Sequence, residues 1–264
     1  DLEGLASLAG QGNATSRGAV LDGGVAPVDA SNGAVEAPSF TWLTPSVPAR
    51  WHEADWGAAV FVDAQTGGHP LFPGGGIAEI VRAAARWTAA AGLQLAPGTY
   101  RAGRCVSDLG PGDGRISIAF DDPCGEIADE SPTLALGGAY YTSADVRRVG
   151  DVDFWKITKG IIVTDNVLAK FAGFSTGCWD ELMTHELGHA IGLGHAAARP
   201  SVMYPELSAD CATRTESLPL ADDDRAGALA MYPPVAVTGG PPGAPLALTG
   251  VVVGRDVTLL WRPP

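Results

Sequence analysis

The segment from His185 to His195 holds three histidines and one glutamate at a spacing that suits a catalytic zinc ion. On a helix, His185 and His189 lie one turn apart and project from the same face, so both imidazoles can reach one ion. Glu186 follows the first histidine, where its carboxylate can touch a water molecule at the metal without ligating the metal. Gly192 can end the helix in a left-handed conformation, which brings His195 in as a third ligand. Three neutral imidazoles leave the fourth tetrahedral position open, as a catalytic zinc requires.

The alternative for this segment is a helix whose histidines are ordinary surface or core residues. The chain has only 5 histidines among 264 residues. Three of them at these offsets, with the glutamate and glycine in place, are expected by chance at a rate of about 10⁻⁵. The spacing therefore favours a zinc site.

A second motif follows downstream, where the chain reads Ser-Val-Met-Tyr-Pro over residues 201–205. Here the sequence resembles the metzincin zinc peptidases, in which a turn with a methionine, the Met-turn, lies beneath the metal. The Met-Tyr-Pro form is most similar to the matrixin branch, the matrix metalloproteinase-like enzymes. The resemblance implies that Met203 shapes the floor of the site without ligating. Pro205 stands where astacin-like relatives carry a tyrosine, so we expect no tyrosine ligand. Ala196 departs from the serine that matrixins usually have after the third histidine.

The resemblance covers about residues 39–232 and implies an α+β fold. This fold has a mixed, twisted five-stranded sheet, three helices, and a small C-terminal subdomain with the third histidine and the Met-turn. The sequence pattern agrees with that order of elements. Strand-like segments occur at residues 57–63, 93–96, 114–120, 136–142 and 160–164. Helical patterns occur at residues 77–91, 179–191 and 222–232.

Three further segments flank this catalytic domain. Residues 1–38 are rich in Gly, Ala, Ser and Asn and predict a flexible tail or a propeptide remnant. They contain no cysteine, so the cysteine by which matrixin propeptides usually silence the zinc is missing from them. Residues 233–245 predict a Pro/Gly-rich linker. Residues 246–264 resemble the first two strands of a fibronectin type III domain; being too few for that sandwich, they must dock elsewhere, pair with each other or stay mobile.

The four cysteines allow three pairings, and none of them forms a CxxC pair. Cys178 precedes the zinc helix and Cys211 follows the Met-turn, so a bridge would join the two ends of the active-site wall. Cys105 and Cys124 flank the apolar run 116–120 and could close that loop. We favour these two disulfides over four free thiols, which implies an oxidising, extracellular setting.

The composition limits which kinds of partner the chain can bind. A formal net charge of -13 argues against nucleic acid and anionic membranes. No apolar run reaches the roughly 20 residues that a membrane span needs. The sequence begins at Asp1 without the basic and apolar regions of a secretion signal, so we expect a secreted monomer whose signal has been removed or left out.

The expected activity is that of a zinc endopeptidase that acts on extended polypeptides. Glu186 is the expected general base, which passes its proton to the leaving amine as general acid. The resemblance implies that substrate adds as a strand along the sheet edge, and residues 136–141, with Ala139, match that edge by position. An interior strand is the alternative for this segment. Residues 204–211 are expected to wall the pocket for the side chain that follows the scissile bond.

Other metal sites are more open. His52 and His69 are the only histidines outside the zinc motif, too few for the structural zinc that many matrix metalloproteinases carry. Calcium is a further candidate through carboxylates that could equally be exposed charge: Asp121, Asp122, Asp151 and Asp153. For residues 222–224, three consecutive aspartates, a helix cap is favoured over a calcium site.

Two other functions stay open from sequence. A non-catalytic extracellular adhesion or matrix-binding module predicts a damaged zinc motif, yet all four of its ligand and base residues are present. A zinc amidase acting on small or cell-wall peptides would share the metal chemistry but not the Met-turn.

Overall fold

The computed structural model describes residues 40–44, 46–100, 112–214 and 218–234, together with the backbone of three further strands at 17–22, 247–253 and 256–262. The chain divides into two compact units, Asp1–Pro234 and Val235–Pro264. The first unit contains both sequence motifs of the candidate zinc site, the histidine motif and the Met-turn.

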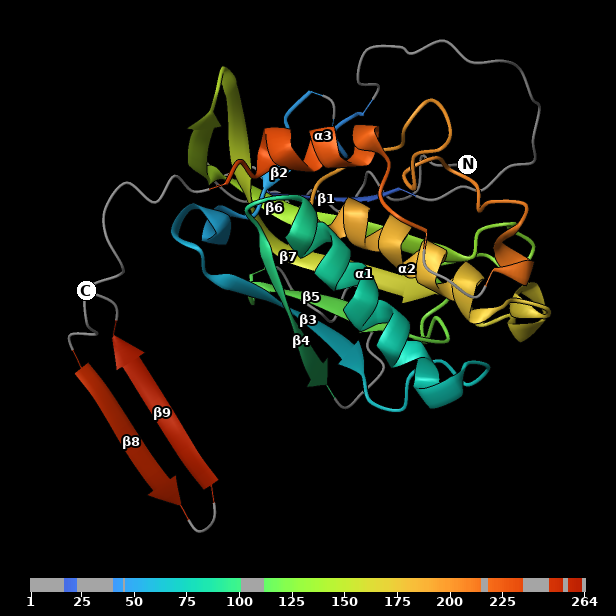
Figure 1. Cartoon of the computed structure of the whole chain (residues 1–264), viewed down its shortest axis with the longest axis horizontal. Coiled ribbons are helices and arrows are strands. Elements are labelled where there is room, and N and C mark those ends of the chain that lie inside the picture. Colours follow the sequence, from blue (N-terminus) through green and yellow to red (C-terminus); the bar gives the residue numbers. More distant parts are fainter. Residues whose placement is uncertain are drawn as a thin grey trace. The chain divides into compact units, whose positions relative to one another are not determined.

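The first unit is built on a mixed sheet (Figure 1). Its strands are β1 Arg17–Asp22, β2 Ala49–Arg50, β3 Ala59–Gln65, β4 Gln94–Tyr100, β5 Arg115–Ala119, β6 Ala135–Val149 and β7 Val152–Thr164. The order across the sheet is β1-β6-β7-β5-β3-β4, and β2 pairs with β7 off this path. β3, β4, β5 and β7 run parallel, whereas β6 is antiparallel to both β7 and β1. Strand β5 lies inside the sheet, and Ile116–Ala119 is buried throughout, as expected for a parallel strand covered on both faces.

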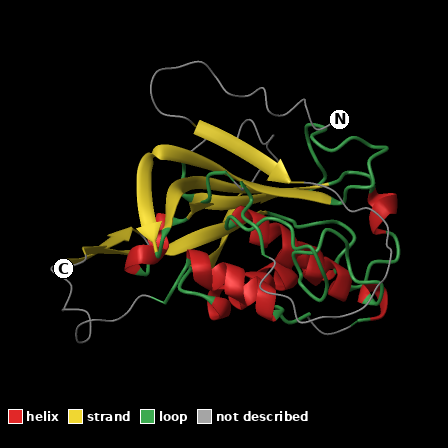
Figure 2. Cartoon of the chain, turned by 90° about the horizontal axis from the view of Figure 1, so that it is seen from above, coloured by secondary structure: helices red, strands yellow, loops and turns green. Residues whose placement is uncertain are grey.

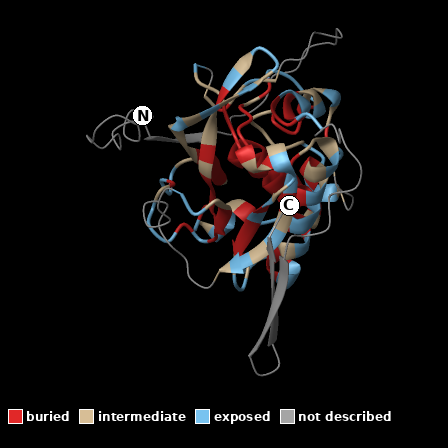
Figure 3. Ribbon diagram, turned by 90° about the vertical axis from the view of Figure 1, so that its left-hand side faces the viewer, coloured by how far each residue is buried: buried red, intermediate tan, exposed pale blue. Residues whose placement is uncertain are grey.

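Two long helices, α1 Ile77–Ala90 and α2 Thr176–Ala190, lie side by side on one face of the sheet (Figure 2). A third helix, α3, spans Asp222–Met231. Short 3₁₀ segments occur at His52–Trp56, Pro73–Gly76, Leu168–Phe171 and Cys211–Thr213. Buried residues gather where the helices and the sheet meet (Figure 3). Helix α1 contributes an apolar stripe to this core, whereas almost every residue of α2 is buried.

The predicted α+β fold is confirmed, with all five predicted strands and all three predicted helices in the sheet and the layer below it. Two short N-terminal strands, β1 and β2, extend the sheet beyond those five. Helix α2 begins earlier than predicted, at Thr176, because the Ser175 hydroxyl accepts hydrogen bonds from the backbone N–H groups of Gly177 and Cys178. His185, Glu186 and His189 therefore lie in the last turns of a longer helix, and His195 follows its end.

The segments outside the catalytic domain differ in what the structure describes. Arg17–Asp22, inside the segment for which the sequence predicts a tail, forms β1. In the second unit, β8 Ala247–Val253 and β9 Asp256–Arg262 pair with each other as an antiparallel hairpin, one of the three arrangements that the sequence allows. The likeness of this hairpin to fibronectin type III strands stays a prediction, and residues 235–245 of the predicted linker lie outside the described residues. Among the described helices, none has the length and hydrophobicity that crossing a membrane needs.

Candidate metal centre

Helix α2 presents His185 and His189 one turn apart, and both side chains are buried. The helix ends at Ala190, and Gly192 then adopts a left-handed φ of 106°. A Cβ atom at this position would overlap the carbonyl oxygen of Ala49, so a side chain is excluded both by conformation and by space. The chain turns at Gly192 and returns His195 toward the helix.

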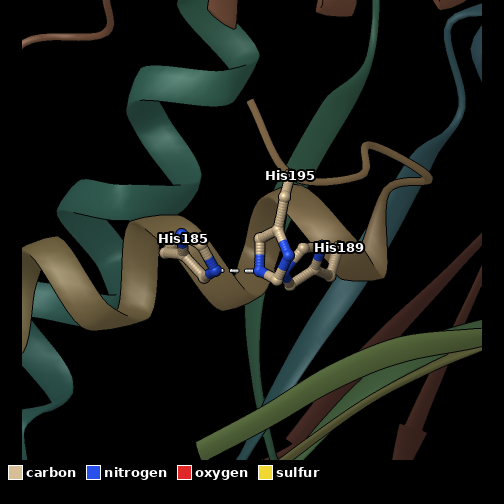
Figure 4. Close-up of side chains that lie close together, drawn as sticks. All are labelled: His185, His189 and His195. Atoms are coloured by element: carbon tan, nitrogen blue, oxygen red, sulfur yellow. Dashed lines mark hydrogen bonds between the residues drawn. The ribbon is translucent and has the colours of Figure 1, made fainter. Parts of the chain in front are cut away.

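The three imidazoles converge on one point (Figure 4). Their ring centroids are 4.6, 4.8 and 5.2 Å apart, which places the three rings in a nearly equilateral triangle. One nitrogen from each of His185, His189 and His195 lies within 4.8 Å of the others. Among the described residues, this is the one group of three or more potential metal ligands that is this close together.

The hydrogen bonds of the rings show that the site fits a cation. Nδ1 of His185 lies 2.7 Å from the carbonyl oxygen of Val202, and Nδ1 of His189 lies 2.8 Å from that of Leu193. A carbonyl oxygen only accepts, so each Nδ1 carries the proton, and in the neutral ring Nε2 is the nitrogen with the lone pair. These two Nε2 atoms face each other at 3.0 Å. Two lone pairs at that distance repel unless a cation lies between them, and neutral imidazole is the form that binds zinc.

The charge state of His189 agrees with that assignment. Its side chain is completely buried, and burial is the main cause that lowers its pKa to about 3, with the nearby His195 as a second cause. His189 is therefore neutral at physiological pH and ready to ligate without first losing a proton.

Glu186 lies beside the histidines, in contact with strand β6. A Cβ atom added to Gly137 would come within 2.6 Å of both the carboxylate Oε2 and the backbone oxygen of Glu186. Only a glycine allows the β6 backbone to pass this close to the carboxylate. Sequence reasoning did not single out Gly137, although a Gly-Gly pair inside a strand is a known signal of close backbone approach.

The Met-turn packs beneath helix α2. Met203 is buried, and a Cβ atom at Gly188 would overlap its sulfur, so the thioether lies directly against the helix between the two ligating turns. The turn is held by the buried Asp224 of α3. Its carboxylate accepts hydrogen bonds from the Ser201 hydroxyl and from the backbone N–H of Val202 at 2.9 Å and of Met203 at 3.3 Å.

Asp224 was missed as a site residue, because the aspartate triplet predicted only a helix cap. That capping contact is present, since Asp224 also accepts from the backbone N–H of Ala221 at 2.8 Å. Through Val202, whose carbonyl oxygen accepts from His185, the carboxylate is two hydrogen bonds away from a candidate zinc ligand.

The loop that follows the Met-turn is fastened to the N-terminal half of α2. The disulfide Cys178–Cys211 joins the two, as the sequence suggested. Glu181 adds two contacts, accepting from the backbone N–H of Ser208 at 2.7 Å and from the Arg214 guanidinium at 2.9 Å. The predicted pocket wall at residues 204–211 is therefore anchored on the same helix that carries the histidines.

Comparison with known proteins agrees with this geometry. The family model of the matrixins matches residues 78–233, more than half of the chain. The chain belongs to the matrixin family. A plant relative, metalloendoproteinase 1-MMP of Arabidopsis thaliana, is 44% identical over 55 residues, 21% of this chain and 14% of that protein. Rat matrilysin (Rattus norvegicus) is 47% identical over 49 residues, 19% of this chain and 17% of that protein. The chain thus aligns with less than a fifth of the length of either relative.

Matrixin membership supports a zinc metallopeptidase in general terms, and the structure places the other predicted residues as follows. Ala139 is buried in β6, where it pairs with Gly160 of β7 on one side and with Val20 of β1 on the other. The predicted edge of the sheet is therefore covered by the chain's own β1. A substrate-binding role for Ala139 stays a prediction.

The remaining metal and cysteine predictions have mixed outcomes. His52 and His69 are both buried and lie outside the metal-ligand group. Asp122 accepts from the backbone N–H of Glu126 and Ile127, and Asp153 from Arg148. Calcium at these carboxylates stays a prediction. Cys105 lies outside the described residues, so its bridge to Cys124 also stays a prediction.

Proposed function

We propose that this matrixin domain is a secreted zinc endopeptidase that hydrolyses peptide bonds of extended polypeptides, with Glu186 as general base and then general acid. The observation that carries the proposal is that Nε2 of His185 and Nε2 of His189 face each other at 3.0 Å, on the helix that also carries Glu186. The two curated relatives are named as a metalloendoproteinase and as matrilysin, which supports the same activity here.

Each residue of the site has a distinct role in this proposal. His185, His189 and His195 would hold the zinc, which when bound supplies polarisation of the scissile carbonyl and acidification of a water molecule. The Glu186 carboxylate would accept the proton from that water and donate it to the leaving amine. Gly137 lets the β6 backbone lie directly against Glu186, because a Cβ atom at this position would come within 2.6 Å of the carboxylate.

The edge of β6 supports binding of an extended peptide. Residues 137–142 pair there with β1 in an antiparallel register that runs from Asp22 opposite Gly137 to Arg17 opposite Thr142. The main-chain groups of this edge are thus able to accept an added strand. A substrate would displace β1 from this edge and place its own backbone beside Glu186.

The setting and accessory ions are part of the proposal. The disulfide Cys178–Cys211 favours an oxidising compartment and hence secretion. A monomer is expected, and calcium is proposed as an additional, structural ion bound by carboxylates.

The test is cleavage of an unfolded protein by the chain and its Glu186→Ala variant, with zinc supplied and bound zinc quantified in both. We expect loss of cleavage with zinc still bound in the variant. Glu130→Ala, a change at an exposed glutamate away from the site, is the matched control and should cleave as the wild type does. Equal cleavage by the wild type and Glu186→Ala would refute the role of Glu186. Hydrolysis of short peptides without cleavage of a long polypeptide would favour the amidase, and zinc binding without any hydrolysis would favour a binding module.

A further inference from the structure

His195 is held differently from the other two candidate ligands. His185 and His189 are fixed by the hydrogen bonds of helix α2, whereas His195 follows the end of that helix on a loop and is only partly buried. The orientation of its ring therefore depends on whatever holds this loop. A ligand on an unsupported loop would lose conformational entropy each time the metal binds, and this loss would weaken metal binding.

The loop is paired with a segment from the other end of the domain, Phe40–Leu43, which we call the N-terminal strap. Two main-chain hydrogen bonds and one isolated β-bridge join them: Leu43 N–H to the Gly192 carbonyl at 2.9 Å, Gly194 N–H to the Thr41 carbonyl at 2.9 Å, and the bridge between Trp42 and Leu193. The strap thus acts as a short antiparallel partner for the loop, although more than a hundred residues separate the two in sequence.

One side chain of the strap reaches the ligand residue itself. The Thr41 hydroxyl donates a 2.7 Å hydrogen bond to the carbonyl oxygen of His195. The approach is close enough that a Cβ atom at Gly194 would overlap the Thr41 hydroxyl and lie 2.6 Å from the Trp42 carbonyl oxygen. We propose that Thr41 is a positioning residue for the third zinc ligand, an inference that rests on the zinc site proposed above.

The strap is itself anchored and can serve as a rigid support. The Phe40 N–H donates to Asp223 of α3 at 3.0 Å. The Trp42 ring packs against Phe154 of β7 with ring centroids 5.5 Å apart and nearly perpendicular planes, and Leu43 is part of the buried core. A support fixed at both ends lowers the disorder of the His195 carbonyl and hence of the ring attached to the same residue.

The experiment measures zinc affinity by competition with a chromophoric chelator, on the full chain and without any peptide substrate. Thr41→Val removes the donor and keeps the shape, and we expect the zinc dissociation constant to rise about tenfold. Thr41→Ser restores the hydroxyl and should return the affinity to within about twofold of wild type. Thr44→Val is the matched control, because Thr44 directly follows the strap and its hydroxyl donates to the Val47 carbonyl.

The outcomes separate this inference from the zinc site on which it rests. A His195→Ala variant with unchanged zinc affinity would show that the zinc site itself is wrong. Weaker zinc binding in His195→Ala but not in Thr41→Val would overturn the role of Thr41 alone. Equal losses in Thr41→Val and Thr44→Val would also overturn it, because a general loosening of the strap would then be the cause. Unfolding of the zinc-free proteins, followed by circular dichroism, should give the same midpoint for wild type and Thr41→Ser.

Discussion

Replacing Asp224 with alanine should weaken both the domain and its zinc site, although this side chain does not touch the metal. The carboxylate is 1% exposed and accepts hydrogen bonds from the Ser201 hydroxyl and from three backbone N–H groups. In the variant, the Ser201 hydroxyl and the backbone N–H groups of Val202 and Ala221 lose this acceptor, whereas the Met203 N–H keeps the Ser201 hydroxyl oxygen at 3.1 Å. The change therefore creates a cluster of unsatisfied polar groups at the Met-turn rather than a simple cavity.

The magnitude follows from the number of donors. One buried donor without a partner costs about 1 kcal/mol at the low end of the measured range. Three such donors should reduce the free energy of unfolding by about 3 kcal/mol. For a domain of this size, about 3 kcal/mol corresponds to a fall in Tm of roughly 6–12 °C. Zinc affinity should fall as well, because Val202 both donates to Asp224 and accepts from His185.

The assay is thermal unfolding followed by circular dichroism, combined with zinc competition against a chelator. Asp222→Ala is the matched control in the same helical turn. Its carboxylate is fully exposed and pairs with Arg225 on the surface, so its loss should leave the free energy of unfolding almost unchanged. If Asp224→Ala unfolds within about 1 °C of Asp222→Ala and binds zinc as tightly, the reasoning about the Met-turn is refuted.

Three further predictions follow from other parts of the domain. Gly137→Ala should lower kcat at least tenfold with zinc content unchanged, because the added methyl group would collide with the Glu186 carboxylate. Peptide kinetics and metal analysis measure these two quantities, and an unchanged kcat would contradict the close contact between Gly137 and Glu186. Deletion of residues 1–30 removes β1 from the β6 edge, so KM for an extended peptide should fall several-fold at similar kcat; an unchanged KM would mean that β1 does not compete. His69 is buried among aromatic rings, and burial lowers its pKa. As pH falls below about 6.5, the unfolded chain takes up a proton that the folded chain resists, so stability should fall. The loss should be smaller in His69→Phe when denaturant unfolding is compared at pH 7.5 and 5.5, and parallel losses would exclude His69 as a cause.

The chemistry of the site could be predicted from sequence because it is local. His185 and His189 are four residues apart, and a helix alone brings them together. The strands and helices of the domain were likewise visible as apolar patterns. Contacts between segments far apart in the sequence could not be predicted. The order of strands in a sheet depends on such contacts, so the sequence could not decide whether β6 was an edge or an interior strand. The answer involves Arg17–Asp22, which has none of the alternation that marks a half-buried strand.

The supports of the site were missed for the same reason. Neither the residue type nor the sequence pattern marks Thr41, Gly137 or Asp224 as a site residue. Each contacts a residue far away in the chain. A single hydroxyl or carboxylate gives no periodic signal, and its partner is defined only once the fold exists. Glycine pairs and buried acids are signals of such contacts, but they do not identify the partner.

The aspartate triplet shows how the fold assigns different roles to identical residues. Consecutive side chains on a helix point about 100° apart, so the three aspartates that begin α3 face three directions. Asp222 faces solvent, Asp223 accepts from Phe40 of the strap, and Asp224 holds the Met-turn. The last two contact the supports of two candidate zinc ligands, since the strap bonds to His195 and the Met-turn bonds to His185. The start of α3 is therefore where the supports of two ligands meet, and a shift of this helix should disturb both ligands together.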